Sequence, residues 1–536
     1  MTSRHPSEHP AQSASPAPGG PPGFPGSAPP SGRRAWVGLA VLALPALLAS
    51  LELTVTHLAL PTIGTQLGAS STQQLWIVDI YAFMLAGSML AMGSVGDRIG
   101  RRRLLLTGAA VFAAASSAAA YAPNAETLIA LRAVMGVSGS TLMPSVLALT
   151  AALFPDRSRR RVAVGAVIAA VSGGTAVGPL VGGWLLEHFW WGSVFLIGVP
   201  VMALLLLLGP WLLPETGARP EKRVDVVSAL LTVGTVLPLV YALKRFGAGE
   251  GGGAGLLLVS AGVVMGVAFV RRQRRLDTPM VDPALFRNPA FTVTLVALAL
   301  GIFVLWGTNY ATAQYLQLVE GLTPLRAGLW TAPAAAGVIV GSTLAPHLAR
   351  RVGTGTTVGG GLAVAAVGFA VLARVGAGGD LASLVAGSVI VSAGLGPMMA
   401  LATERVISSA PAERAGSASA MASMAPQLGG ALGIAVLGSV ITATYRHRMD
   451  DAVPPGTPNG PADAARDNLA DAVDAAKSLP APTNSDVLEA ARQAFAGGLR
   501  LSAAISCAIA GLLAFATLRF LPSRRDEQDP SAARNT

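Results

Sequence analysis

The chain of 536 residues contains few charged side chains and a single cysteine. Only 12% of the residues are charged, against roughly 25% in a typical soluble domain, which argues against a soluble protein. One cysteine, Cys507, excludes an internal disulfide bond, and we interpret it as a packing residue in an apolar run. A G-x-x-x-x-G-K-[ST] segment is also missing, which argues against a protein driven by ATP.

Hydrophobic residues make up 52% of the chain and gather in long runs. Runs of about 20 apolar residues are long enough to cross a bilayer core of roughly 30 Å. We therefore expect an all-α integral membrane protein with about fourteen transmembrane helices. They are predicted at 36–58, 73–95, 102–121, 125–152, 160–186, 190–213, 224–246, 253–272, 290–319, 322–347, 354–375, 380–404, 413–443 and 498–521. The pair around "GAGEGGGAG" could instead form a re-entrant hairpin.

The net charge of +10 could suggest a nucleic-acid partner, but its distribution argues otherwise. Arginine clusters such as 101–103 and 159–161 recur at every second loop, and the loops between them carry almost no positive charge. Lys244 with Arg245 is the visible exception. Because positively charged loops stay in the cytoplasm, we expect a multi-pass membrane protein with both termini cytoplasmic, and no nucleic-acid partner. The excess of arginine over only three lysines (Lys222, Lys244 and Lys477) is associated with GC-rich bacteria, so the expected location is a bacterial plasma membrane.

Two similar segments indicate an internal repeat, with chance similarity as the alternative. "GSVGDRIGRRR" (93–103) follows the second predicted helix, and "GSTLAPHLARRVGTG" (341–355) follows the tenth. Parallel repeats of this kind build secondary transporters. The expected domains are a disordered cytoplasmic tail (1–34), an N-terminal six-helix bundle (35–214), an inserted helix pair (215–275), a C-terminal six-helix bundle (276–521) with an extracellular loop (444–497), and a cytoplasmic tail (522–536).

The loop 444–497 differs in composition from the rest of the chain. It is polar and rich in Ala and Asp, and two short amphipathic helices are expected near 461–478 and 484–497. A solvated extracellular cap and a lid over the exit are both compatible with this composition.

Three charged residues lie within predicted helices of the N-terminal bundle, where charges are costly and therefore functional candidates. Glu52, Asp79 and Arg132 are each about six or seven residues from the outer helix end, roughly 9–10 Å deep. One arginine cannot neutralise two carboxylates, so we expect one carboxylate to stay unpaired and to exchange protons. A static ion pair is the alternative. We interpret His57 as a solvated interfacial residue, with a proton relay as the alternative.

Polar and aromatic residues of the ninth predicted helix, and small residues of the fifth, are further candidates. "FVLWGTNYATAQYLQ" contains Trp306, Asn309, Tyr310 and Gln314, which could line a cavity for lipophilic ligands or could face lipid or core. "SGGTAVGPLVGGW" places three glycines four residues apart, beside Pro179. Such a bare helix face permits close helix approach, and the proline offers a bend.

Together these segments resemble the major facilitator superfamily, in particular its fourteen-helix drug:proton antiporter branch with the Qac- and Smv-type multidrug exporters. "LELTVTHLALP" is similar to the first-helix motif of the branch, "LWIVDIYAFMLAG" to its second helix and "LRAVMG" to its fourth-helix motif. The resemblance implies proton coupling and cation recognition for Glu52, Asp79 and Arg132. It implies a conformational lock at Gly93, Asp97, Arg98, Gly100, Arg101 and Arg102, and an antiporter motif at Gly174, Gly178, Pro179, Gly182 and Gly183.

Two departures from the family pattern bear on the substrate. Position 52 is Glu where the family usually has Asp, which keeps the carboxylate on a longer arm. Qac-type exporters carry further acids in helices ten and thirteen, whereas no carboxylate occurs here between Arg326 and His347 or between Ala415 and Thr444. Bulky monovalent cations or neutral antibiotics are therefore favoured over divalent cations.

The sequence thus predicts proton-coupled efflux of lipophilic drugs by alternating access, without enzymatic activity, cofactor or metal. The expected partners are a small-molecule drug or antibiotic, protons and the lipid bilayer, with the protein itself monomeric. A dedicated exporter of one self-made antibiotic or metabolite is the first alternative, and a non-transporting membrane receptor or channel is the second.

Overall fold

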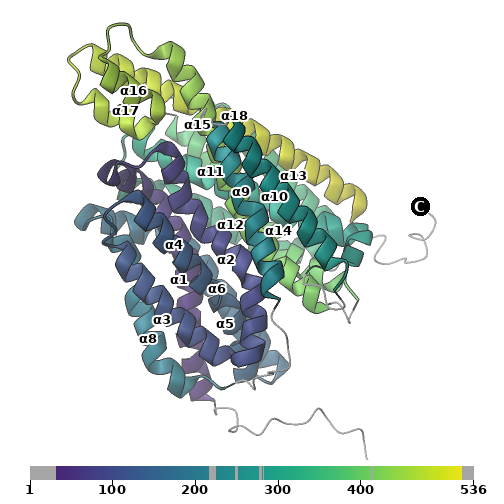
Figure 1. Ribbon diagram of the computed structural model, residues 1–536. Helices are drawn as coiled ribbons and strands as arrows, with labels where there is room; N and C mark the ends of the chain where they lie inside the picture. Colours follow the sequence, from purple (N-terminus) through teal and green to yellow (C-terminus); the bar gives the residue numbers. More distant parts are fainter. Residues whose placement is uncertain are drawn as a thin grey trace, which may run out of the picture.

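The computed structural model describes residues 32–215, 225–247, 252–276, 281, 283–378, 380–411 and 415–521. Within these ranges the chain forms helices and no β-strand (Figure 1). The all-α prediction is thereby confirmed. The predicted tails lie outside the described residues, apart from residues 32–34.

The amino-terminal half is a bundle of long helices broken at a few polar or small residues. It comprises α1 (Arg33–Leu67), α2 (Ser71–Ile99), α3 (Arg101–Ala119), α4 (Ala125–Gly139), α5 (Leu142–Leu153), α6 (Arg157–His188), α7 (Ser193–Leu196) and α8 (Gly198–Leu212). Side chains of Ser70, Asn124 and Asp156 accept hydrogen bonds from backbone N–H groups at the starts of α2, α4 and α6. These caps fix where the three helices begin.

A helix hairpin follows, formed by α9 (Val226–Gly247) and α10 (Gly252–Gln273). Each helix has 22 residues and is therefore about 33 Å long, enough for a full crossing rather than a re-entrant loop. At its base the Asp225 carboxylate accepts a hydrogen bond from Arg272 at 2.8 Å. Figure 1 shows the hairpin beside α2 and α15, at the junction of the two halves.

The carboxyl-terminal half repeats the bundle arrangement. It comprises η1 (Pro283–Arg287), α11 (Pro289–Gln314), the π-helical η2 (Tyr315–Val319), α12 (Pro324–Val352), α13 (Thr354–Leu372), α14 (Leu381–Ser408), α15 (Ala415–Ala452), α16 (Asn459–Asp467), α17 (Leu469–Ala476) and α18 (Thr483–Phe520).

Eleven helices of the described chain are long and apolar enough to cross a membrane, and two bent pairs raise the number to thirteen. The bent pairs are the two parts of α2 and the two parts of α6. The predicted count of fourteen is not confirmed. The remaining expected span, 102–121, corresponds to α3, which begins with three arginines.

Several predicted helix boundaries are wrong. The helix predicted at 413–443 continues to Ala452 as α15, and the amphipathic helix predicted near 461–478 is two short helices, which end at Asp467 and Ala476. The first helix was expected to end at 58, before Pro61, but α1 continues to Leu67 with Pro61 inside it. Pro61 lacks the N–H that would donate to the His57 carbonyl one turn earlier, and transmembrane helices tolerate such a proline because neighbouring groups and local adjustment re-satisfy the freed backbone. The segment 484–497 is not a separate amphipathic helix but the first part of the continuous α18.

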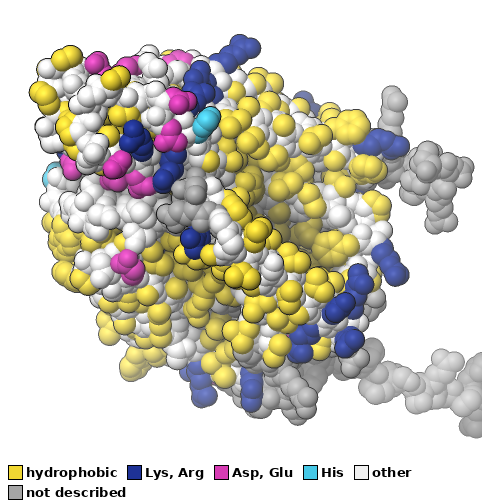
Figure 2. All heavy atoms as spheres, turned by 45° about the horizontal axis from the view of Figure 1, so that its top comes forward, with side chains coloured by type: hydrophobic (Ala, Val, Ile, Leu, Met, Phe, Trp, Pro, Cys, Tyr) yellow, Lys and Arg dark blue, Asp and Glu magenta, His cyan; other side chains and the backbone are white. Residues whose placement is uncertain are grey.

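A polar cap composed of α16 and α17 stands on the ends of α15 and α18 (Figure 1). Tyr445 of α15 donates to the Ala465 carbonyl at 2.7 Å, and Arg446 pairs with Asp467 at 2.9 Å. Ser71, at the start of α2, donates to the Asp467 carbonyl at 2.9 Å. The cap therefore touches both halves. Figure 2 shows acidic side chains gathered on it, above a surface that is largely hydrophobic.

The halves also meet below the cap, where α6 packs on α12 without side chains between the backbones. A Cβ added at Gly183 would lie 2.6 Å from the Leu325 Cα, and one added at Gly328 would overlap the Pro179 carbonyl oxygen. Both glycines are therefore required for this close approach.

Candidate functional site

A fully buried ion pair joins α1 to α4. Arg132 Nη1 donates to Glu52 Oε1 at 2.7 Å, and both side chains are at most 1% exposed. The predicted equal depth of the two residues is consistent with this contact. A buried pair of this kind avoids the large cost of a lone charge in an apolar environment.

Arg132 is held by α2 as well as by α1. Its Nε donates to the Ile77 carbonyl at 2.9 Å, and its guanidinium carbon lies 4.7 Å from the centre of the Tyr81 ring and 5.7 Å from that of Phe195. The planar guanidinium can make all these contacts at once, as a lysine could not. Arg132 thus links four helices of the amino-terminal half.

A second buried ion pair joins α2 to α9. Lys244 Nζ lies 2.9 Å from Asp79 Oδ2, and neither side chain is exposed. The same ammonium lies 4.2 Å from the centre of the Trp76 ring, one turn before Asp79. Cations are attracted to the faces of aromatic rings, most strongly to tryptophan.

This pair corrects the expectation of an unpaired carboxylate. The expectation considered only Arg132 as a counter-ion, but Asp79 points to α9 and has its own cation there. The helix α2 lies between the two pairs, with the Ile77 carbonyl facing Arg132 and Asp79 facing Lys244. The sequence did hold a signal, because Lys244 was the exception to the alternation of charged loops.

His57 is also placed differently from the expectation of a solvated residue. It is 6% exposed, and its ring packs edge-on against Tyr310 of α11 with the centroids 6.2 Å apart. Its position on α1 therefore makes it part of the contact between the two halves.

The four candidates on α11 do not line one common surface. Tyr310 and Gln314 are buried, Trp306 is partly buried and Asn309 is exposed. Trp306 packs against the hydrophobic clusters of both halves, and its ring lies where a side chain at Gly430 would be. Tyr310 and Trp306 are thus interface residues, whereas Asn309 points elsewhere.

The glycines of α6 form the expected bare face, and α1 packs on it. A Cβ added at Gly174 would overlap the Leu47 carbonyl oxygen, and one at Gly178 would overlap the Thr54 hydroxyl. One at Gly182 would lie 2.8 Å from a methyl group of Val55. Gly183 and Pro179 contact α12 instead, so α6 joins α1 to the other half.

The predicted lock segment forms the corner between α2 and α3. Gly100 takes a φ of 99°, and Asp97 pairs with Arg101 across that corner. Arg102 pairs with Glu215 at 2.6 Å and donates to the Leu213 carbonyl at 3.1 Å, which fastens α3 to the end of α8. Gly93 lies in open space and Arg98 is exposed.

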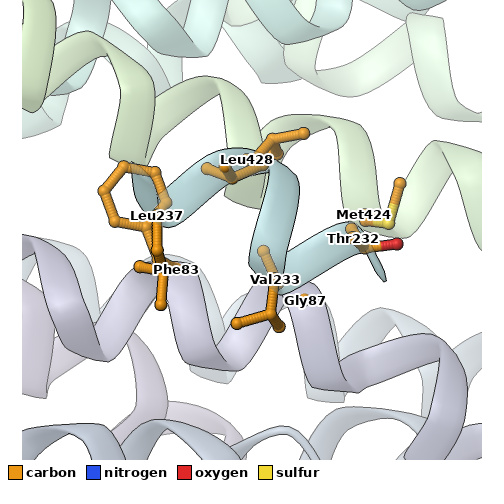
Figure 3. Close-up of a pocket in the computed structure, with 9 residues that line it drawn as sticks. Phe83, Gly87, Thr232, Val233, Leu237, Met424 and Leu428 are labelled. Carbon is orange, nitrogen blue, oxygen red and sulfur yellow. The ribbon is translucent and has the colours of Figure 1, made fainter. Parts of the chain in front are cut away.

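Two hollows of the described chain are lined in part by α2, and neither lining includes Glu52 or Asp79. One of about 10 Å³ lies where α2, α9 and α15 meet, between Phe83, Val233 and Leu428 (Figure 3). It has barely the volume of one water molecule. The other, an apolar groove of about 400 Å³, lies among α2, α3, α4 and Thr141.

Comparison with known proteins identifies the family. Residues 42–434 match the family model of the Major Facilitator Superfamily. The chain belongs to this superfamily. It is accordingly a membrane transporter rather than an enzyme, and the predicted resemblance is confirmed.

Relatives within the Major Facilitator Superfamily are drug and antibiotic exporters. The chain is 42% identical over 473 residues to the multidrug efflux pump LfrA of Mycolicibacterium smegmatis, covering 88% of this chain and 94% of that protein. It is 34% identical over 470 residues to the methyl viologen resistance protein SmvA of Salmonella typhimurium, covering 86% and 93%. It is 30% identical over 515 residues to the tetracenomycin C resistance and export protein of Streptomyces glaucescens, covering 94% and 95%.

Solved structures show the same fold at low sequence identity. A bacterial homologue of the human lysosomal transporter Spinster, in an inward-facing and unoccupied conformation, matches with a TM-score of 0.61 and 18% identity, over 92% of this chain and 99% of that one. A peptide transporter of the POT family matches with a TM-score of 0.59 and 15% identity, over 91% and 96%.

Proposed function

We propose that this protein is a proton-coupled exporter of lipophilic drugs, acting by alternating access between its two halves. The observation that carries the proposal is the pair of fully buried carboxylates, Glu52 and Asp79, each facing a cation across a helix interface. A carboxylate in such a place can change its protonation state when its counter-ion moves, which is what proton coupling requires.

Outside protons would protonate Asp79 or Glu52 and release the drug, and deprotonation on the inside would prepare the site for the next drug. One pH unit supplies about 1.4 kcal/mol for each proton. A membrane potential of 100 mV adds about 2.3 kcal/mol for each net charge moved. Exchange of a monocation for one proton uses only the pH difference, whereas two protons would also use the potential.

Bulky monocations and neutral amphiphiles are the substrate class that the site favours. Both buried carboxylates lie in the amino-terminal half, and both are already matched by one cation each. The relative named for multidrug efflux supports a broad substrate range. The relative named for methyl viologen resistance supports a cationic substrate, but methyl viologen carries two positive charges and so does not favour monocations over dications.

The proposed arrangement in the cell follows the distribution of charge. The arginine-rich corner between α2 and α3 would face the cytoplasm, together with both termini, and the acidic cap would lie outside the plasma membrane. The lock role of 93–102 and the antiport role of the α6 glycines belong to the same proposal, with the protein acting as a monomer.

The test uses purified protein in proteoliposomes loaded with ethidium, under an imposed pH gradient. We expect gradient-dependent transport by the wild type and its loss in Asp79→Asn or Glu52→Gln. A wild type that transports ethidium equally well without a gradient would refute proton coupling. Normal transport by both variants would reduce the buried carboxylates to structural ion pairs.

A dedicated exporter of one antibiotic is the second candidate, favoured by the relative named for tetracenomycin C export. The two candidates differ in breadth. Cells that express a multidrug pump gain resistance to several unrelated lipophilic compounds, whereas cells that express a dedicated exporter gain resistance to one.

A further inference from the structure

The surroundings of the Lys244 ammonium have the composition of a site for an organic cation. The carboxylate of Asp79 lies 2.9 Å from Nζ, and the face of Trp76 lies 4.2 Å from it. The Trp76 ring in turn contacts the Tyr241 ring, with the centroids 5.8 Å apart. An anionic group beside aromatic faces is the arrangement that proteins use to bind quaternary ammonium groups.

The carboxylate has unused capacity for a ligand. Asp79 Oδ1 is buried and has no hydrogen-bond partner among the described residues. A buried acceptor without a partner is costly unless something binds it at another stage of the protein's cycle.

We propose that Lys244 is a built-in occupant of a cation site formed by Asp79 and Trp76. In the empty transporter its ammonium fills the site, and a lipophilic monocation competes with it for the same carboxylate and ring. This inference rests on the proposed function, because it requires that the transporter take cationic substrates. It assigns the hairpin α9–α10 a direct part in the exchange.

The position of Lys244 on α9 allows its ammonium to reach water when it is not bound to Asp79. It lies in the last turn of the helix, three residues before the final residue Gly247. A lysine near a helix end can extend its four-carbon stem so that the ammonium reaches water. When a drug cation enters, Lys244 can therefore leave Asp79 without carrying its charge across hydrocarbon.

Comparison with the other ion pair separates an exchangeable cation from a fixed one. Arg132 is held by Glu52, by the Ile77 carbonyl and by two aromatic rings. Lys244 is held by one carboxylate and one ring, on a flexible side chain. A rigid guanidinium suits a permanent link, and a compact ammonium with rotatable bonds suits displacement.

Competition of this kind predicts the direction of affinity changes. The apparent dissociation constant of a ligand rises in inverse proportion to the fraction of protein whose site is free. If Lys244 occupies the site for nine-tenths of the time, its removal should tighten binding by about tenfold. Replacement of Lys244 by Arg should weaken binding of the ligand, because a guanidinium can donate two parallel hydrogen bonds to the Asp79 carboxylate.

The experiment measures the dissociation constant of ethidium for the purified full-length protein by fluorescence titration. We expect Lys244→Met to lower the constant about tenfold and Lys244→Arg to raise it. The matched control is Lys477→Met, which removes the same charge from an exposed pair with Asp474 in the cap and should leave the constant unchanged. The double variant Asp79→Asn with Lys244→Met should lose the gain, because the carboxylate is gone.

Transport in proteoliposomes provides a readout that a structural role would not produce. Lys244→Met should lower the KM for ethidium and also lower the maximal rate, because no internal cation helps to displace the drug from Asp79. A purely structural lysine predicts instead weaker binding in the Met variant and near-normal binding in the Arg variant.

The outcomes distinguish this inference from the proposed function. Saturable ethidium binding by the wild type, with no change or a rise in the constant for Lys244→Met, overturns the inference and leaves efflux intact. Absence of ethidium binding in both the wild type and Lys244→Met overturns the inference together with the cationic part of the proposed substrate class, whereas export of neutral amphiphiles is decided by gradient-dependent transport of a neutral antibiotic. If the Met variant does not fold, the Arg variant decides, because an unchanged or lower dissociation constant there contradicts competition.

Discussion

Arg132 contacts Glu52 through one guanidinium nitrogen and the Ile77 carbonyl through another, so that one side chain ties α1 and α2 to α4. The partners differ in kind. Glu52 can gain or lose a charge, whereas the backbone carbonyl cannot. A change at Glu52 therefore alters how strongly Arg132 holds α1 while its hold on α2 persists.

Replacement of Arg132 by Ala should abolish gradient-driven ethidium transport. The change leaves the Glu52 carboxylate without a cation, and breaking a buried ion pair in this way costs about 3–5 kcal/mol. Transport in proteoliposomes should fall to the level of empty liposomes, with the protein still inserted in the membrane. Arg274→Ala, at an exposed arginine beyond α10, serves as the control and should transport normally. Normal transport by Arg132→Ala would exclude the pair from the mechanism.

Gly174→Ala should destabilise the protein and slow transport, because its methyl group would overlap the Leu47 carbonyl oxygen and force α6 away from α1. Overpacking of this kind costs about 1–3 kcal/mol. Thermal unfolding and ethidium transport give the two readouts. The adjacent Gly173 has open space at its Cβ position, so Gly173→Ala is a matched control that should behave as wild type. Equal behaviour of the two variants would contradict the packing described for this face.

Pro179→Ala should weaken the coupling of proton and drug movement. α6 bends by 41° near Thr175–Val177, and Pro179 lacks the N–H that would complete the helix ladder just beyond the bend. Restoring that hydrogen bond should straighten α6 and disturb its contact with Gly328. The measurement is the ratio of protons to drug moved in inside-out vesicles.

Gly328→Ala should produce a similar defect from the other side of the same contact, because its methyl group would overlap the Pro179 carbonyl oxygen. Gly360→Ala, a glycine of α13 with free space around it, is the control. An unchanged proton-to-drug ratio in Pro179→Ala would mean that the proline only packs.

Acidic pH should stabilise the cap formed by α16 and α17. Burial, together with the neighbouring Asp467 and Asp474, raises the pKa of Asp471 above its ordinary value of 3.8, although Asn468 donates a hydrogen bond to it. A carboxyl group with a raised pKa in the folded state stabilises that state when protonated. This contribution should be complete below pH 3.8 and should be lost as the pH rises through the raised value.

Hydrogen exchange of the amides in α16 and α17, corrected for intrinsic rates, measures this effect. The wild-type cap should become more protected as the pH falls, and Asp471→Asn should remove most of the pH dependence. Protection that decreases on acidification in the wild type would show that another group controls the cap.

Much of the amino-terminal site could be predicted from the sequence because helix geometry determines it. Residues at equal depth on neighbouring membrane helices can meet, and Glu52 and Arg132 do so. The regular spacing of Gly174, Gly178 and Gly182 likewise predicted a bare face, and α1 occupies it.

The partner of Asp79 could not be predicted in the same way. Lys244 meets Asp79 only because the hairpin α9–α10 packs against α2. The sequence pattern of α9 does not specify which helix α9 packs against. The burial of His57 has a similar cause, since it results from contact with Tyr310 in the other half. Predictions from local pattern therefore succeeded within one bundle and failed where separate parts of the chain meet.

The lengths of α15 and α18 have a mechanical consequence. Each has 38 residues and is thus about 57 Å long, almost twice the thickness of the bilayer core. Both helices therefore extend beyond the bundle, and the cap packs on their extended ends. A rotation of the carboxyl-terminal half would therefore displace the cap further than the bundle, and the hydrogen bonds from Ser71 to Asp467 are among the contacts between the halves that such a displacement would break.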